Sequence, residues 1–206
     1  MFCTPKNLKE QLETQAENVS SSDFIRKPQH KPLKEMWCAA QFGLGYEKHV
    51  TTCWLSVNPE ENSDTDFILK TETGQFPFQT TIADIPGRCM GDEHKPDPNG
   101  TLPTTSYEPE RGRMEGPKWI ADAIKNKVEK NYSNSKDISL LVYANFTAHQ
   151  LDYQALCNEV EKYKDNFLSI WVITNHQIFS LMTTPILGEI RYLANVYGSE
   201  ELLSML

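Results

Sequence analysis

The sequence predicts an α/β fold in which a mixed central sheet is flanked by helices. Two patterns and the chain length lead to this prediction. Three short runs with strand character follow one another between residues 50 and 83. Helical and apolar strand patterns then alternate over residues 117–174, which is the order of a parallel strand-helix-strand unit. A chain of 206 residues that is 39% hydrophobic can bury one sizeable core, so we expect one main domain.

Residues 1–31 predict an N-terminal helix and a basic arm. Thr4 and Pro5 form a hydroxyl cap and first-turn proline ahead of an apolar row at helical spacing. Serines, prolines and positive side chains follow, as in a solvated linker or in an arm that contacts phosphates or an acidic partner. The main domain then covers residues 32–206 and begins with a helix that carries Glu35 near its start.

The three central runs, at residues 50–57, 66–70 and 76–83, predict an antiparallel meander. The last two flank Thr-Glu-Thr-Gly, a sequence suited to a hairpin turn. Side chains alternate between the faces of a strand, so an apolar face should be buried and should hold Phe76, Phe78, Thr80 and Ile82. The opposite face then projects Gln79 and Thr81 together, close to Asp66 in the neighbouring strand.

A long insertion is predicted at residues 85–116, which contain several prolines and glycines and little periodicity. This loop follows the strand that bears Gln79 and could close over a bound molecule. We expect Arg88, Arg111 and Arg113 to bind substrate there. A helix that starts at Pro117 and carries Lys127 comes next, and the chain should end with an edge strand at residues 177–181 and a closing helix at 186–206.

Composition limits the compartment and the partners. The formal net charge of -8 disfavours non-specific adhesion to nucleic acid and favours a protein partner. The cysteines form no C-x-x-C pair and indicate reduced thiols. Without an apolar run of about 20 residues or a leader pattern, we expect a cytoplasmic protein with no membrane segment. The oligomeric state stays open.

An acid, a hairpin and a polar-x-polar pair occur in that order at Asp66, Gln79 and Thr81. This stretch resembles the restriction-endonuclease-like nucleases of the PD-(D/E)xK superfamily. The order helix, three strands, helix, strand, helix, strand over residues 32–174 is also similar to the core of that superfamily. The resemblance implies a three-layer fold, with the meander and the parallel unit in one mixed sheet. Gln79 stands where the superfamily usually has Glu or Asp, and Thr81 where it has Lys.

The resemblance implies a metal-dependent nuclease that acts on nucleic acid phosphodiesters with Mg²⁺ or Mn²⁺. Asp66, Gln79 and Glu35 would hold the metal, with Asp84 as the alternative to Glu35 for the second negative charge. Lys127, or Lys70 near the hairpin turn, would replace the cation missing at Thr81. Losing such a preorganised charge costs about 10²–10³ in rate. The alternative is a catalytically inactive module of the same fold that binds a protein or nucleic acid as a regulator or inhibitor.

Overall fold

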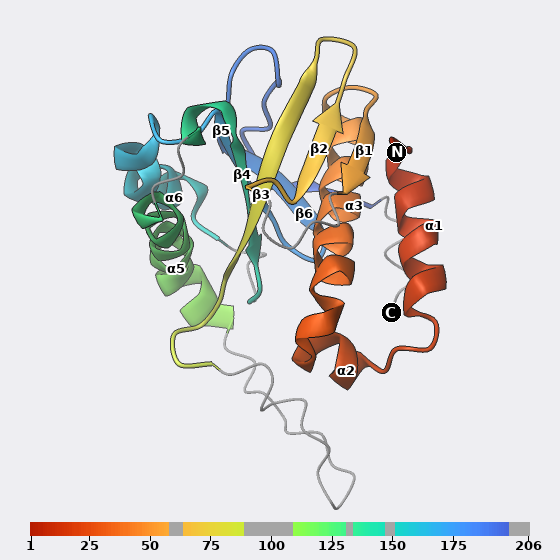
Figure 1. Ribbon diagram of the computed structural model, residues 1–206. Helices are drawn as coiled ribbons and strands as arrows, with labels where there is room; N and C mark the ends of the chain where they lie inside the picture. The colour runs from red at the N-terminus through yellow and green to blue at the C-terminus, as the bar shows by residue number, and fades with distance from the viewer. Residues whose placement is uncertain (58–63, 89–108, 131–133, 147–150, 198–206) are drawn as a thin grey trace, which may run out of the picture.

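This computed structural model describes residues 1–57, 64–88, 109–130, 134–146 and 151–197. Within them the strands form one seven-stranded mixed sheet with strand order β1-β2-β3-β4-β5-β6-β7, curled into a half-barrel (Figure 1). The predicted mixed α/β architecture is confirmed. The strands are β1 (Trp54–Val57), β2 (Phe67–Lys70), β3 (Gln75–Ala83), β4 (Ser139–Ala144), β5 (Ser169–Ile173), β6 (Gln177–Met182) and β7 (Ala194–Asn195).

Helices cover both faces of the sheet. Figure 1 shows α3 on one face with α1 on its outer side, and α5 and α6 on the opposite face. The α-helices are α1 (Pro5–Ala16), α2 (Ser21–Arg26), α3 (Lys31–His49), α5 (Pro109–Glu129) and α6 (Tyr153–Val160). The short 3₁₀ helices are η1 (Pro28–His30), η2 (Ser135–Asp137) and η3 (Glu161–Tyr163).

The strand pairing agrees with the sequence prediction for the meander and for the parallel unit. Strands β1, β2 and β3 pair antiparallel as a meander, and the hairpin turn closes with the Thr71 amide 2.9 Å from the Gly74 oxygen. Strands β3, β4 and β5 are parallel neighbours, with α5 and α6 in the connections. The predicted edge strand is β6, but β7 pairs with its outer side.

Two hydrophobic cores hold the layers together. Phe42 of α3 is fully buried against the aromatic rings of Phe67, Phe78 and Trp171. On the other face, Ile120 and other side chains of α5 and α6 pack on β4 and β5. Since β4 and β5 are covered on both sides, their sequences are almost continuously apolar.

Two glycines allow α3 to approach its neighbours closely. A Cβ atom at Gly45 would lie 2.7 Å from Ile178 Cγ2 of β6, and one at Gly43 would lie 3.0 Å from Pro5 Cγ of α1. Real Cβ atoms do not sit at the shorter of these distances. The Gly-Leu-Gly sequence of α3 is therefore a packing feature, and it fixes how the helix is seated against α1 and β6.

The predicted closing helix is wrong for the residues that are described. Residues 183–197 form turns and the short β7 in place of a helix. Gly188 adopts φ +66°, and the Tyr46 hydroxyl of α3 donates to the Leu187 oxygen at 2.8 Å. Contacts with α3 thus hold this segment in a non-helical path. The rest of the predicted helix, residues 198–206, lies outside the described residues.

The insertion predicted at residues 85–116 is shorter than expected. Its last eight residues, 109–116, belong to α5, which starts at Pro109 and passes through Pro117. An Arg113–Glu110 pair of 2.6 Å and an Arg111–Glu115 pair of 3.0 Å line this first part of the helix. The sequence pattern indicated Pro117 as a helix start, but this proline lies inside α5. Two exposed pairs add only about 0.2–0.5 kcal/mol each, so they do not by themselves offset an interior proline. Residues 89–108 lie outside the described part.

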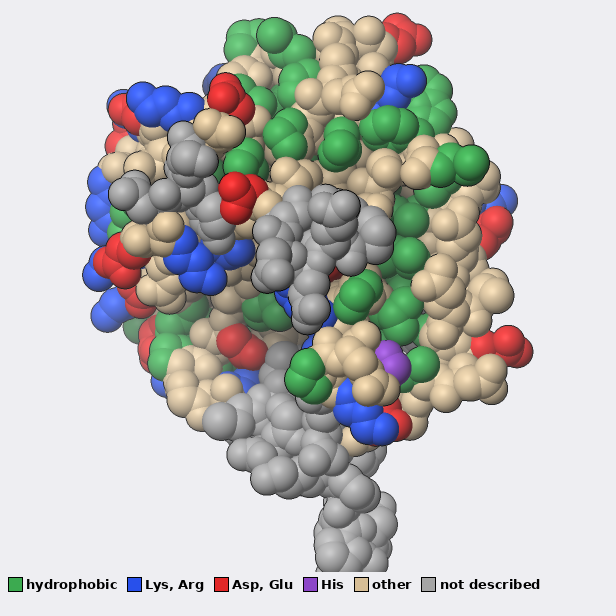
Figure 2. All heavy atoms as spheres, in the orientation of Figure 1, with side chains coloured by type: hydrophobic (Ala, Val, Ile, Leu, Met, Phe, Trp, Pro, Cys, Tyr) green, Lys and Arg blue, Asp and Glu red, His purple; other side chains and the backbone are tan. Residues whose placement is uncertain are grey.

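The surface over α5 and α6 differs from the surface over the meander. On the face shown in Figure 2, positive and negative side chains are interspersed over α5 and α6, whereas hydrophobic side chains gather over the meander. Trp54 and Ile68 are half-buried, and along their strands they alternate with the buried Leu55 and Phe67. In the described part of the chain, no helix combines the length and the apolar character needed to cross a membrane.

Candidate functional site

Asp66 lies beside the middle of β3, at the point where the pairing between β2 and β3 ends. Its backbone amide donates to the Phe78 oxygen at 2.8 Å, immediately before β2 begins. The ladder between β2 and β3 ends at the pair Phe67–Phe78, although β3 continues to Ala83. Beyond this point the Asp66 carboxylate replaces the backbone partner of β3. Its Oδ2 accepts hydrogen bonds from Thr80 N and Thr80 Oγ1, both at 2.6 Å.

Glu35 brings a second carboxylate to Asp66 from α3. Its side chain is 12% exposed and forms an ion pair of 3.1 Å with Lys31 one turn earlier. Burial raises the pKa of the Glu35 carboxyl, and the negative charge of Asp66 raises this pKa further. The two acids are thus close enough for their charges to interact, and a bound cation would relieve their repulsion.

Lys127 brings a positive charge from the opposite face, near the end of α5. Its Nζ donates to Gln79 Oε1 at 2.9 Å. Burial lowers the pKa of the Lys127 ammonium, while the charges of Asp66 and Glu35 oppose this shift. Lys127 therefore lies within electrostatic reach of both acids. The structure brings Glu35, Asp66, Gln79 and Lys127 together, and we call these four residues the acid–lysine cluster.

The two faces of β3 are covered differently from the expected pattern. Phe78 is buried as predicted, but Ile82 is 51% exposed and Gln79 is only 5% exposed. On the other side, α5 covers β3, because Lys127 of α5 bonds to Gln79 and Ala83 packs in the same core as Ile120 and Ile124. Thr81 lies half-buried on the α5 face with Gln79.

The three predicted substrate-binding arginines lie away from the acid–lysine cluster or are engaged in other contacts. Arg88 donates to Asp84 at 3.2 Å and to the Asn145 oxygen at 2.9 Å, beyond the ends of β3 and β4. Arg111 and Arg113 lie in the first turns of α5 and pair with glutamates of the same helix. Sixteen residues of helix separate Arg111 from Lys127, a distance of about 24 Å.

The donors in the cluster suit a small, hard cation. Within the described residues, no group of three or more His, Cys, Asp or Glu side chains could hold a metal. Mg²⁺ needs less than this, because it keeps several waters and is held by one or two carboxylates together with substrate oxygens. Asp66 and Glu35 supply two carboxylates, and Gln79 Oε1 has a second lone pair beside its bond to Lys127. The residues present therefore fit Mg²⁺ or Mn²⁺.

The raised pKa of Glu35 predicts a particular pH dependence of stability. A carboxyl whose pKa is higher in the folded state holds its proton more tightly there, so its contribution to stability falls as pH rises through that pKa. Glu35→Gln should remove this fall. The unfolding free energy of the variant, compared with that of the wild type, should thus rise between pH 4 and pH 7. Loss of the Lys31 pair lowers the stability of the variant by about 0.3–0.5 kcal/mol.

Urea unfolding of both proteins at several pH values measures this difference. Glu13→Gln serves as the control, because the Glu13 side chain is 63% exposed and should show a constant difference from the wild type. A constant difference for Glu35→Gln as well would contradict the placement of Glu35 close to Asp66.

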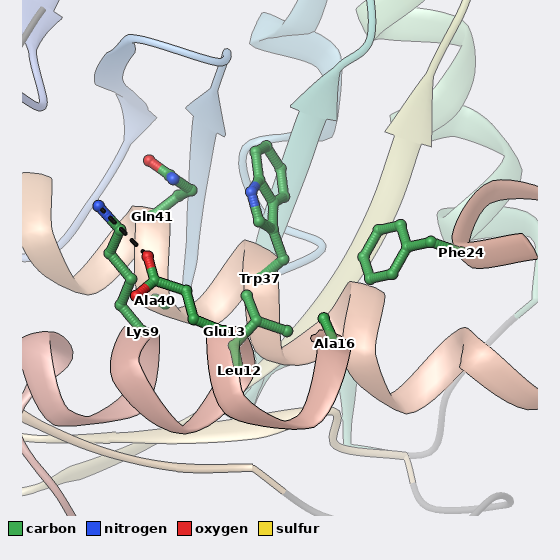
Figure 3. Close-up of a pocket in the computed structure, with 8 residues that line it drawn as sticks. All are labelled: Lys9, Leu12, Glu13, Ala16, Phe24, Trp37, Ala40 and Gln41. Carbon is green, nitrogen blue, oxygen red and sulfur yellow. Dashed lines mark ion pairs between the residues drawn. The ribbon is translucent and has the colours of Figure 1, made fainter. Parts of the chain in front are cut away.

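A separate pocket lies between α1, α2 and α3. It has a volume of about 290 Å³ and an ion pair, Lys9–Glu13, at its rim (Figure 3). The rings of Phe24 and Trp37 and the side chain of Gln41 contribute to its walls. Because a helix turns about 100° per residue, Trp37 and Gln41 lie on a different side of α3 from Glu35. The pocket is thus distinct from the acid–lysine cluster.

Sequence reasoning missed two contributors to the cluster. Lys31 was assigned to a basic arm, but it is the first residue of α3 and pairs with Glu35. The Thr80 hydroxyl was assigned to the buried face, yet it donates to Asp66. A threonine beside a strand end carries no sequence signal for this contact, which depends on where β2 stops.

Comparisons of this chain with protein-family models, with curated proteins and with solved structures gave no match. The function therefore has to be argued from the chemistry of the acid–lysine cluster.

Proposed function

We propose that the protein is a metal-dependent nuclease-like enzyme that acts on phosphodiester bonds of nucleic acid. One observation carries the proposal. Lys127 is bonded to Gln79 and is an electrostatic neighbour of Asp66 and Glu35, so a cation from α5 joins the acids where Thr81 supplies none.

The arrangement of elements supports the proposal. Along the chain, α3 precedes β1, β2 and β3, and α5, β4, α6 and β5 follow in that order. This is the order of elements on which the resemblance to the PD-(D/E)xK nucleases rests. The acids lie on α3 and at the start of β2, and Gln79 lies on β3. Each predicted ligand thus occupies the element that the resemblance implies for it.

The roles of the residues follow from their chemistry. A bound Mg²⁺ would polarise the phosphodiester and lower the pKa of a water molecule. Asp66 would anchor the ion, Glu35 would add a second negative charge, and Gln79 would contribute a neutral oxygen. Lys127 would stabilise the extra negative charge of the pentavalent phosphate, because a partly buried ammonium acts in a low-dielectric environment. Gln79 also holds Lys127 in place through their bond of 2.9 Å.

Affinity for nucleic acid would depend on local charge. The formal net charge is -8, so the protein as a whole repels phosphates. Two further lysines lie close enough to Lys127 to affect its pKa, namely Lys31 and Lys130. The Lys31 side chain is 56% exposed and Lys130 is also exposed. These lysines would hold the phosphates that flank the reacting one.

Lys127→Met tests the proposal directly. Methionine has a similar length but no charge, so the Mn²⁺-dependent or Mg²⁺-dependent cleavage rate should fall by about 10², as for other preorganised charges. The assay uses labelled single-stranded DNA, double-stranded DNA and RNA. Mn²⁺ affinity, measured by calorimetry, should be retained, because Lys127 is not a ligand.

Two further variants sharpen this test. Lys125→Met is the matched control, since Lys125 lies on the same helix, is 55% exposed and pairs with Glu129. It should cleave at the wild-type rate. Adding Thr81→Lys to Lys127→Met should recover part of the lost rate, because a cation returns to the neighbouring position on the α5 face. Equal rates for wild type and Lys127→Met would remove Lys127 from the mechanism.

A further inference from the structure

We infer that the Thr80 hydroxyl is a positioning residue for the metal-binding carboxylate of Asp66. The inference rests on the proposed function, since it assigns to Asp66 the role of metal ligand. It adds a residue that does not touch the metal or the substrate and that acts only through Asp66.

Asp66 bonds to β3 where the β2–β3 ladder ends. After the pair Phe67–Phe78, β3 continues without β2 beside it. The Thr80 amide would then meet solvent on that side, but it donates to Asp66 Oδ2 at 2.6 Å. Asp66 therefore occupies the place of a strand neighbour. This backbone bond alone would hold the carboxylate by a single contact at Oδ2.

The Thr80 hydroxyl adds a second bond to Asp66. Thr80 Oγ1 donates to the same carboxylate oxygen, Oδ2, also at 2.6 Å. Two donors from one residue converge on one oxygen, so loss of the hydroxyl would leave this oxygen held by the amide alone. In the described part of the chain no donor bonds to Oδ1, so this oxygen can accept a cation without giving up a bond.

The Thr80 hydroxyl lies on the side of β3 that faces α3, the helix of Glu35. Thr80 shares a strand face with Phe78, which packs against Phe42 of α3. Glu35 is on the same helix and close enough to Asp66 for its pKa to be affected. The hydroxyl thus orients Asp66 on the side of β3 from which the second carboxylate approaches. Removing it should loosen the pair of acids without removing either of them.

Calorimetric titration with Mn²⁺ alone tests this inference without an activity assay. Thr80→Val keeps the branched shape of the side chain and loses the donor, so the Mn²⁺ dissociation constant should rise about tenfold, as for other residues that orient metal ligands. Thr80→Ser keeps a hydroxyl and should stay within about threefold of the wild type. Thr80→Ala loses the same donor with a smaller volume, and it gives the answer if the valine variant does not fold.

Thr183→Val is the matched control. It removes a hydroxyl that donates to the Gly188 oxygen at 2.7 Å, after β6 and three strands away from β3. It should change the midpoint of thermal unfolding but not the Mn²⁺ dissociation constant. If wild type binds Mn²⁺ and both Thr80→Val and Thr80→Ala bind it equally well, the inference fails and the proposed function stands. If wild type binds no Mn²⁺, both fail.

Discussion

Asp66→Asn should abolish metal-dependent cleavage, with a loss in rate of at least about 10³. Asparagine keeps the size of the side chain, and its oxygen can still accept bonds from Thr80. It loses the negative charge that would hold the cation, which is worth several kcal/mol of transition-state stabilisation. The loss should therefore appear in the rate, while the thermal midpoint changes by no more than about 2 °C.

The control for this experiment is Asp152→Ala. The Asp152 side chain caps α6 by accepting from the Ala155 amide at 2.9 Å. Its removal should lower stability by about 1 kcal/mol and leave cleavage unchanged. Full activity of Asp66→Asn would move the active site elsewhere. If the wild type cleaves none of the three nucleic acid substrates with Mg²⁺ or Mn²⁺, the protein is not a nuclease, and the alternative of an inactive binding module stands.

Phe42→Ala should destabilise the protein by about 3–5 kcal/mol. Phe42 is completely buried, and its ring centroid lies 4.9 Å from that of Phe78 and 5.4 Å from that of Trp171. The ring joins α3 to β2, β3 and β5, so its loss leaves a cavity that these elements cannot all close. For a chain of this size the thermal midpoint should fall by roughly 6–20 °C.

Urea unfolding followed by circular dichroism measures this loss. Phe24→Ala is the matched control, because Phe24 is only partly buried on the short α2 and should cost about 1 kcal/mol. The urea dependence of the unfolding free energy should stay constant in both variants. A loss for Phe42→Ala no larger than that for Phe24→Ala would show that the core closes around the missing ring.

The meander was predictable because its information is local. Thr-Glu-Thr-Gly specifies a hairpin turn, and the turn sets the register that brings Asp66 opposite Gln79. Which side of β3 is buried was not predictable. Alternation defines two faces, but it cannot show that α5 covers Gln79 or that Ile82 stays exposed.

The errors in helix boundaries also have a physical cause. Pro117 is a strong local signal for a helix start, but α5 begins at Pro109 and continues through Pro117. The segment after β6 has helical spacing, yet the Tyr46 contact with Leu187 and the conformation of Gly188 hold it against α3. Such long-range contacts have no signature in a short stretch of sequence.

The glycines of α3 have a consequence for how this protein can change over evolution. Close contacts with Pro5 and Ile178 fix the rotation of the helix about its axis at Gly43 and Gly45. Glu35 lies two turns earlier on the same helix. Inserting or deleting one residue between them would turn its carboxylate by about 100° around the axis. Inserting a whole turn would restore the direction but would move the carboxylate about 5.4 Å along the axis. The spacing between Glu35 and these glycines is therefore fixed wherever Glu35 stays close to Asp66.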